Sequence, residues 1–358
     1  MPNDVRRYDS HAPSSRFCSN GAASNMFAIF SADLSRKQRL QSERCRARMN
    51  IHTTHTAEGS QPCFFMCPPQ HFAVSYSINP WMDPRAWAES SATLEMEADR
   101  QWVGLRHALL AAGATIETLQ PAPGLPDLVF TANAAVVLDR KVVLSRFRHS
   151  ERRDEEPIFA AAFAKLAERG LVHQITRLPA GIVLEGAGDC IWDSWRRLFW
   201  MGCGFRSEPA AARILEKQLG IPCLCLPLAQ ASFYHLDTAF CALPCGSVIY
   251  YPRAFTPAAL ATIHGHVASR ERIEIDETDA ARFAANAVCI HRTIVLSSCS
   301  LALRSTLEER GYDVLETPLH AFQCSGGSAC CLTLRLDHCS GGSSARISAE
   351  QQLGGTAL

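Results

Sequence analysis

The sequence predicts an α/β fold in which five repeated units close into a ring. Between two polar ends, four stretches share the order strand, tight turn, strand, helix and strand. The first strand of each stretch opens with a polar Asn or Asp, and these residues are separated by 56, 48 and 49 positions. A period of this size indicates repeated supersecondary units. The 358-residue chain is 47% hydrophobic and 20% charged, which is typical of a globular protein.

The first two units are expected in residues 131–178 and 186–228. Their strands are short apolar runs bounded by turn residues, which is typical of buried strands. Their helices, at residues 158–170 and 208–220, place apolar residues three and four positions apart. Each helix ends at a glycine, the residue that favours a left-handed C-cap.

Units three and four are expected in residues 235–275 and 284–319, each with a helix of the same kind. A fifth first strand, residues 329–336, has no helix of its own after it. A strand at residues 72–77 and a long helix after Pro84 can complete this fifth unit. The start and the end of the repeat region are therefore expected to meet, which closes the ring.

Polar residues that open the first strands are expected to surround a common axis. They are Asn133, Asp189, Asp237 and Asn286, and Cys331 follows 45 positions after the last of them. If five units close into a ring, these side chains face one central pocket, where a binding site is favoured. The alternative is that the Asn and Asp residues serve only as turn formers before each strand.

Both ends of the chain differ in composition from the repeats. We expect a disordered N-terminal extension at residues 1–60, the repeat domain at 61–338 and a flexible tail at 339–358. Residues 36–48 carry six basic side chains against one acidic side chain. This stretch is interpreted as part of a disordered tail, and an amphipathic basic helix or an import signal is the alternative.

Charge and cysteine spacing exclude several classes of protein. The 35 basic and 35 acidic side chains balance, so nothing favours binding to nucleic acid or to a membrane surface. No apolar run approaches the roughly 20 residues of a membrane span, and no secretory signal is evident. The 16 cysteines lack the spacing of zinc ligands, and most lie in apolar strands. We therefore expect free thiols in a reducing cytoplasm and no metal site.

Three short segments carry residues with catalytic chemistry. Cys331 can act as a nucleophile if its pKa is lowered or a base lies near it. His235 can serve as that base and can then protonate a leaving amine. The carboxylates of Glu185, Asp189 and Asp237 can each pair with a planar guanidinium group. Singly each residue has an ordinary structural explanation, but together they favour a cationic, planar substrate.

Six ordered stretches between about residues 64 and 336 resemble the guanidino-group modifying superfamily. This superfamily includes arginine deiminases, dimethylarginine dimethylaminohydrolases and amidinotransferases. The stretches are MCPPQHFAVSYSINPWM, PDLVFTANAAVV, LEGAGDCIWD, LFWMGCGFRS, HLDTAF and SGGSACCLTLRL. The resemblance implies that residues 61–338 form a catalytic domain with the fold of a five-bladed α/β propeller of ββαβ repeats, which agrees with the predicted ring.

The resemblance also implies a role for individual positions. Cys331 matches the nucleophile, beside Cys330 as a frequent neighbour, and His235 matches the general acid/base. Glu185 matches the catalytic carboxylate that grips the guanidinium group. Substrate binding is expected from Asn133, Asp189, Asp237, Arg152, Arg206 and Asn79. The two arginines match residues that bind the substrate α-carboxylate, with solvated arginines as the alternative.

One position departs from the usual pattern of the superfamily. Deiminases and dimethylargininases usually have an Asp where FTAN has Asn133. The combination of FTAN with INPWM, which contains Asn79, resembles a subgroup that includes arginine dihydrolases. An Asn offers no negative charge to a cation, but it spares a neutral, citrulline-like intermediate from facing an unpaired carboxylate.

The predicted function is hydrolysis of the guanidinium C–N bonds of arginine or a methylated arginine. The reaction passes through a thiouronium intermediate on Cys331, and it continues to ornithine, carbon dioxide and ammonia if the ureido product is retained. The alternatives are a deiminase or dimethylargininase that stops at citrulline, an amidinotransferase, and a catalytically inactive arginine-binding member. The predicted partner is a small molecule, no cofactor is implied, and assembly into a homo-oligomer stays open.

Overall fold

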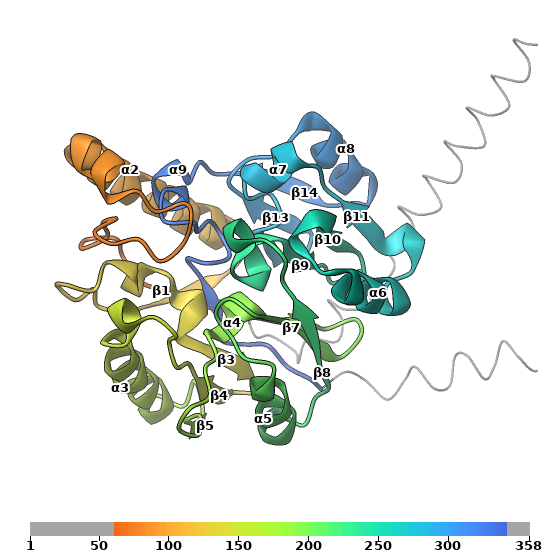
Figure 1. The fold of residues 1–358 in the computed structure, drawn as a ribbon, viewed down its shortest axis with the longest axis horizontal. Coiled ribbons are helices and arrows are strands. Elements are labelled where there is room, and N and C mark those ends of the chain that lie inside the picture. Colours follow the sequence, from red (N-terminus) through yellow and green to blue (C-terminus); the bar gives the residue numbers. More distant parts are fainter. Residues whose placement is uncertain (1–60, 342–358) are drawn as a thin grey trace, which may run out of the picture.

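The computed structural model describes residues 61–341, which form five small three-stranded sheets with helices on their outer side (Figure 1). The strands are β1 (Cys63–Met66), β2 (Thr115–Thr118), β3 (Ala135–Leu138), β4 (Lys141–Leu144), β5 (Gln174–Thr176), β6 (Cys190–Asp193), β7 (Leu198–Cys203), β8 (Cys223–Pro227), β9 (Phe240–Ala242), β10 (Val248–Tyr250), β11 (Arg272–Glu274), β12 (Val288–Ile290), β13 (Thr293–Leu296), β14 (Asp313–Glu316) and β15 (Leu334–Arg335).

Among the described residues, one helix in each unit connects the second and third strands, and three short helices precede a first strand. The α-helices are α2 (Pro84–Ala111), α3 (Glu155–Glu168), α4 (Gly186–Asp189), α5 (Ala210–Leu219), α6 (Pro257–His266), α7 (Glu277–Ala281), α8 (Leu301–Glu309) and α9 (His320–Gln323). The strand orders are β3-β4-β5, β6-β7-β8, β9-β10-β11, β12-β13-β14 and β15-β1-β2. In every sheet one neighbouring pair is antiparallel and the other is parallel, which is the ββαβ pattern. The α/β propeller predicted from the repeats is confirmed.

The fifth sheet joins the two ends of the described chain. In it β1 pairs with β15 antiparallel and with β2 parallel. Two expected details of this unit were wrong. Residues 72–77 form no strand. They form a loop in which Phe72 and Val74 are buried, and the strand that completes the fifth sheet is the earlier β1. Residues 329–332 form turns, so that Cys331 lies in a turn just before β15.

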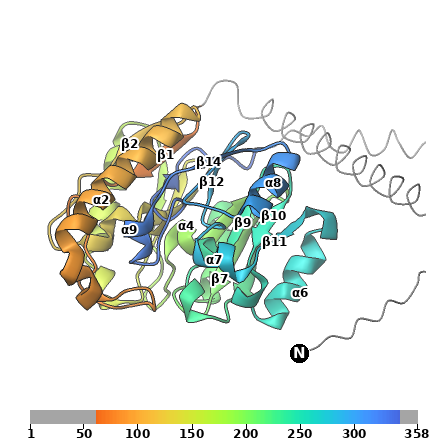
Figure 2. The ribbon, with the colours of Figure 1, turned by 90° about the horizontal axis from the view of Figure 1, so that it is seen from above.

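The helices lie at the periphery and short polar turns lie at the centre. Figure 1 shows α2, α3, α5, α6 and α8 around the outside and α4 near the middle, and Figure 2 shows the same arrangement from above. Apolar clusters fill the space between each helix and its sheet, for example around Leu215 of α5 and Ile263 of α6. Among residues 61–341, no helix is both long enough and apolar enough to cross a membrane. The expectations for residues 1–60 and for most of the C-terminal tail lie outside the described residues.

Strand-opening residues precede the first strands as predicted. Asn133 lies in a 3₁₀ turn before β3, Asp189 ends α4 before β6, and Asp237 lies in a 3₁₀ turn before β9. These turns and the Cys331 turn converge on the same central region, since α4 contacts both 3₁₀ turns and β15 contacts the first of them. The ring of repeats therefore brings side chains that are far apart in sequence to one place.

Candidate active site

Cys331 is buried beside a carboxyl group. Its side chain is 3% exposed, and its Sγ lies 3.1 Å from Oδ2 of Asp237, to which the thiol donates. Burial, and then the charge of Asp237, raise the pKa of the Cys331 thiol well above its ordinary value. Burial raises the pKa of Asp237 to about 7, against hydrogen bonds that lower it. The thiol is therefore protonated at neutral pH while it faces this carboxyl group.

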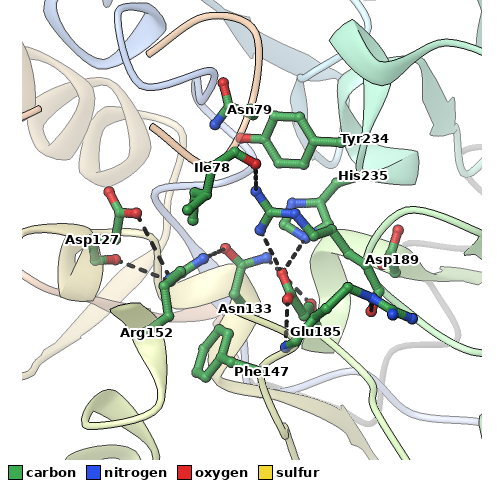
Figure 3. A network of polar contacts seen from close by, with 12 residues as sticks. Ile78, Asn79, Asp127, Asn133, Phe147, Arg152, Glu185, Asp189, Tyr234 and His235 are labelled. Carbon is green, nitrogen blue, oxygen red and sulfur yellow. Dashed lines mark hydrogen bonds and ion pairs between the residues drawn. The ribbon is translucent and has the colours of Figure 1, made fainter. Parts of the chain in front are cut away.

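His235 and Glu185 form the second half of the site. His235 Nε2 lies 2.7 Å from Glu185 Oε2, and the same oxygen accepts from Arg206 Nη1 at 2.9 Å (Figure 3). The other carboxylate oxygen, Oε1, accepts from the backbone N–H of Arg148 at 3.1 Å. With all these donors around it, Glu185 is held in one orientation and directs the imidazole ring.

The charges around Glu185 and His235 set their protonation states. Burial alone would raise the pKa of Glu185, but Arg206, His235 and Arg152 together lower it below its ordinary value. Burial lowers the pKa of His235 to about 4, although Glu185 opposes this shift. At neutral pH the pair is therefore a carboxylate and a neutral imidazole. With Nε2–H donating to Glu185, Nδ1 is the nitrogen that can accept a proton.

Asn133 is oriented by Arg152. Arg152 Nη1 donates to Asn133 Oδ1 at 2.8 Å, and Asn133 Nδ2 donates to the backbone oxygen of Glu185 at 3.2 Å (Figure 3). An amide has two N–H donors, so one of them remains for another partner. Because Arg152 fixes which end of the amide is the oxygen, the second N–H of Asn133 is a donor without a partner among the hydrogen bonds of the described residues.

The two arginines are buried and partly engaged. Arg152 donates to both carboxylate oxygens of Glu155, at 2.8 and 2.7 Å, and to the backbone oxygen of Asp127. Arg206 donates to the backbone oxygen of Ile78 at 3.0 Å, and its guanidinium carbon lies 4.4 Å from the ring centre of Tyr234. Neither arginine is the solvated residue of the alternative interpretation, since they are 3% and 2% exposed.

A small pocket connects these groups. It has an empty volume of about 250 Å³, and its walls are formed by Ile78, Asn79, Asp127, Phe130, Asn133, Arg152, Arg206, Tyr234, His235, Ser325, Gly327 and Cys331. Asn79 is held in this wall because its Nδ2 donates to the backbone oxygen of Ser325 and its Oδ1 accepts from the N–H of Trp81. Six of the nine predicted site residues thus line one pocket, and Glu185 and Asp237 lie directly behind His235 and Cys331.

Asp189 has a different environment from the one expected. Its Oδ2 accepts from Ser207 Oγ at 2.6 Å and its Oδ1 accepts from the N–H of Leu236 at 3.1 Å, and it does not line the pocket. Burial raises its pKa well above the ordinary value. The same Ser207 hydroxyl accepts from the N–H of Glu185 at 2.9 Å. Asp189 therefore holds the segments that carry Glu185 and His235, instead of offering an oxygen to the pocket.

Several site residues were not predicted from the sequence. Asp127 accepts from Tyr76 and Ser325 and lies 3.9 Å from Arg152, while Tyr234 stacks on Arg206. Two signals were present, since Asp127 is the acid of PDLVFTAN and Tyr234 directly precedes His235. Within residues 61–341, no group of three or more His, Cys, Asp or Glu side chains is arranged to hold a metal ion.

Comparison with known proteins agrees with this geometry. The family model described as N,N dimethylarginine dimethylhydrolase, eukaryotic, matches residues 69–337. The bifunctional arginine dihydrolase/ornithine cyclodeaminase AgrE of Nostoc sp. is 44% identical over 273 residues, which are 76% of this chain and 37% of AgrE. The N(G),N(G)-dimethylarginine dimethylaminohydrolase of Mycobacterium tuberculosis is 33% identical over 273 residues, 76% of this chain and 85% of that protein.

Solved structures show the same fold. The N-terminal domain of ArgZ, described as an arginine dihydrolase from the ornithine–ammonia cycle in cyanobacteria, matches with a TM-score of 0.72 and 39% identity in a mutant bound to substrate. The match covers 78% of this chain and 99% of that domain. Unliganded AgrE matches with a TM-score of 0.73 and 43% identity, over 78% of this chain and 39% of AgrE.

Fold and sequence similarity together place the chain in the guanidino-group modifying superfamily, with a propeller of five units and the buried side chains of Cys331, His235 and Glu185 at its centre. Within this superfamily, the chain belongs to the family of the N,N dimethylarginine dimethylhydrolases. It spans little more than a third of the length of the bifunctional relatives that it matches.

Proposed function

We propose that the protein hydrolyses the guanidinium group of free arginine at Cys331 and releases ornithine. The observation that carries this proposal is the pocket in which Cys331, His235 and Asn133 meet, with Asn133 presenting an N–H donor. AgrE, which is 44% identical over 273 residues and is named as an arginine dihydrolase as well as an ornithine cyclodeaminase, supports the same reaction. The second activity in the name of AgrE is not assigned to this chain.

Binding of the cation prepares the nucleophile. Asp237 Oδ1 is buried and has no hydrogen-bond partner among the described residues, so it can accept from a guanidinium N–H. A cation beside Asp237 and Cys331 lowers the pKa of both groups, because opposite charge favours the ionised form. The thiol proton can then leave and the thiolate can attack the guanidinium carbon.

His235 handles the protons of the two half-reactions. The proton that leaves the thiol of Cys331 passes to Nδ1 of His235 as the thiolate attacks. The resulting imidazolium gives this proton to the departing nitrogen, which leaves as ammonia, and a thiouronium group remains on Cys331. The neutral imidazole then takes a proton from water at Nδ1, and the resulting hydroxide displaces the sulfur to give a ureido group. Glu185, bonded to Nε2, stabilises the imidazolium form that appears in each step.

Asn133 favours a second round of the same chemistry. A guanidinium group has only donors, whereas the ureido group of citrulline has a carbonyl oxygen that accepts. The second N–H of Asn133 suits that oxygen, and Arg152 holds the amide in the orientation that leaves this donor available. Citrulline can therefore be held for a second attack by Cys331, which yields ornithine, carbon dioxide and ammonia.

Hydrolysis of dimethylarginine is the second candidate, and the family model that matches residues 69–337 favours it. The test is to incubate the protein separately with arginine and with asymmetric dimethylarginine, and to quantify substrate, ammonia and dimethylamine. The inactive control is Cys331→Ser. We expect consumption of arginine with release of ammonia. Consumption of dimethylarginine alone, with dimethylamine released, would replace the first proposal with the second.

We also propose a reducing, cytoplasmic setting for this chemistry. The described part of the chain holds 14 free cysteines, several of them buried in strands. Free thiols in such number persist where glutathione and thioredoxin keep them reduced.

A further inference from the structure

Asn286 contacts the nucleophile and has no role in the function proposed above. It lies between α7 and β12, in the turn that opens the fourth unit, and it is 0% exposed. Its Nδ2 lies 3.1 Å from Cys331 Sγ and 2.9 Å from the backbone oxygen of Asp237. Its Oδ1 accepts from the backbone N–H of Cys330 at 2.9 Å and from that of Cys331 at 3.3 Å.

These four contacts determine which way the amide of Asn286 points. Both N–H donors and both acceptor positions of the side chain are in use, which is the full capacity of an amide. Turning the amide over would place its N–H groups against two backbone N–H donors and its oxygen against the oxygen of Asp237. The donor end of Asn286 must therefore face the sulfur of Cys331.

We propose that Asn286 is a positioning residue of the nucleophile, which orients the Cys331 sulfur and stabilises its thiolate. In the free protein the sulfur donates to Asp237 and accepts from Asn286, a pattern that fits a thiol. When the thiol proton leaves, the N–H of Asn286 remains directed at the sulfur, and a hydrogen bond to a charged acceptor is stronger than one to a neutral acceptor. This inference rests on the proposed role of Cys331 as nucleophile.

A neutral donor suits this position better than a basic residue. A Lys, Arg or protonated His beside the sulfur would also stabilise a thiolate. However, it would repel a guanidinium cation that must bind Asp237 on the other side of the same sulfur, because like charges at short range disfavour binding. The amide of Asn286 supplies a donor without a net charge.

The test measures alkylation of Cys331 by iodoacetamide, a neutral reagent, between pH 7 and 10 in the full-length protein. A background with both Cys324→Ser and Cys330→Ser leaves Cys331 as the single thiol of the tryptic peptide 311–335 in mass mapping. Hydrogen bonds to charged groups contribute about one to two pKa units. In Asn286→Ala the alkylation rate at pH 8 should therefore fall about 10- to 100-fold, and the pH profile should move to higher pH.

A second variant separates the sulfur contact from the support of the turn. Asn286→Asp keeps an oxygen for the N–H groups of Cys330 and Cys331 but removes the donor to the sulfur, so its profile should also move to higher pH. An unchanged profile in both variants, or in Asn286→Asp alone if Asn286→Ala fails to fold, would overturn the proposal and leave Asn286 a structural residue. Alkylation needs no turnover, so this result stands apart from that of the substrate assays.

Discussion

The two sides of the pocket differ in where their protons lie. On one side Glu185 is ionised and His235 is neutral, because Arg206 and Arg152 stabilise the carboxylate while burial disfavours the imidazolium. On the other side the thiol of Cys331 is protonated, and Asp237 has a pKa of about 7 because it is buried without a cationic partner. On the histidine side, the carboxylate of Glu185 pairs with Arg206 and His235. On the cysteine side, no positive charge balances the carboxyl group of Asp237.

This difference indicates what the substrate contributes. Under the proposed function, the guanidinium cation brings the charge missing from the cysteine side in the first round, so binding of arginine and activation of Cys331 become one event. The histidine side needs no such contribution, since its hydrogen bonds are already made in the free protein. Single substitutions can therefore alter one side of the pocket at a time.

Replacing the nucleophile removes the cysteine side altogether. Cys331→Ser should lower kcat by at least about four orders of magnitude, as expected when a nucleophile is lost. Cys330→Ser should retain most activity, because Cys330 does not line the pocket. Steady-state rates of ammonia release measure both. Comparable losses in the two variants would mean that the nucleophile has been misassigned.

Removing the charge of the histidine side should have the next largest effect. Glu185→Gln keeps the shape but no longer stabilises the imidazolium, so kcat should fall about 10²- to 10⁴-fold. Alkylation of Cys331 by iodoacetamide should change little, since Glu185 does not contact the sulfur. If that alkylation slows as much as turnover does, the two sides are not independent.

Asp237→Asn should raise stability while it lowers activity. The pKa of Asp237 rises from 3.8 to about 7 on folding, so the folded protein binds more protons than the unfolded chain between these values. Stability contributed by this group is therefore present at low pH and is lost as pH rises through about 7. At pH 8 the variant should be more stable than the wild type, on the order of a few kcal/mol, and the gain should vanish near pH 4.

Denaturant unfolding at pH 8 and pH 4 measures the stability change. The wild-type kcat/KM for arginine should fall as pH drops through about 7, because protonated Asp237 no longer pairs with the cation. In Asp237→Asn that dependence should disappear, at a much lower kcat/KM. If Asp237→Asn is less stable than the wild type at pH 8, the ionised carboxylate of Asp237 does not destabilise the folded protein.

Asp189→Asn should have the smallest effect of this series. Asp189 has a raised pKa and contacts only groups outside the pocket, so a neutral amide can accept from Leu236 and donate to Ser207 in its place. We expect kcat and KM to stay within about threefold of the wild type, which contrasts with Asp237→Asn. A loss as large as that of Asp237→Asn would restore the original expectation that Asp189 binds substrate.

The contrast between Asp189 and Asp237 also shows what could be predicted from the sequence. Both residues open a first strand, and their periodic spacing was sufficient to place them near one axis. Neither residue lines the pocket, but Asp237 contacts Cys331 Sγ, whereas Asp189 Oδ2 accepts from the hydroxyl of Ser207, which follows the end of β7. This contact forms only when β6 and β7 have paired, so no local sequence pattern predicts it.

The fifth unit likewise could be predicted only in part from the sequence. Units with both strands joined by a short turn were predicted well, since their patterns are local. The fifth sheet is assembled from β1, β2 and β15, which lie at opposite ends of the described chain. Phe72, Val74 and Tyr76 alternate along the chain as in a strand. They lie instead in a loop whose side chains pack on the core and which leads to Asn79 in the pocket wall.

In the proposed reaction, Asn133, oriented by Arg152, keeps the ureido intermediate for a second hydrolysis. The most direct measurement is the ratio of ammonia released to arginine consumed, with citrulline and ornithine quantified in the same samples, for the wild type and Asn133→Asp. We predict about two ammonia per arginine with ornithine as product in the wild type, and a shift toward one ammonia with citrulline in Asn133→Asp. One ammonia per arginine and accumulated citrulline in the wild type would contradict the claim.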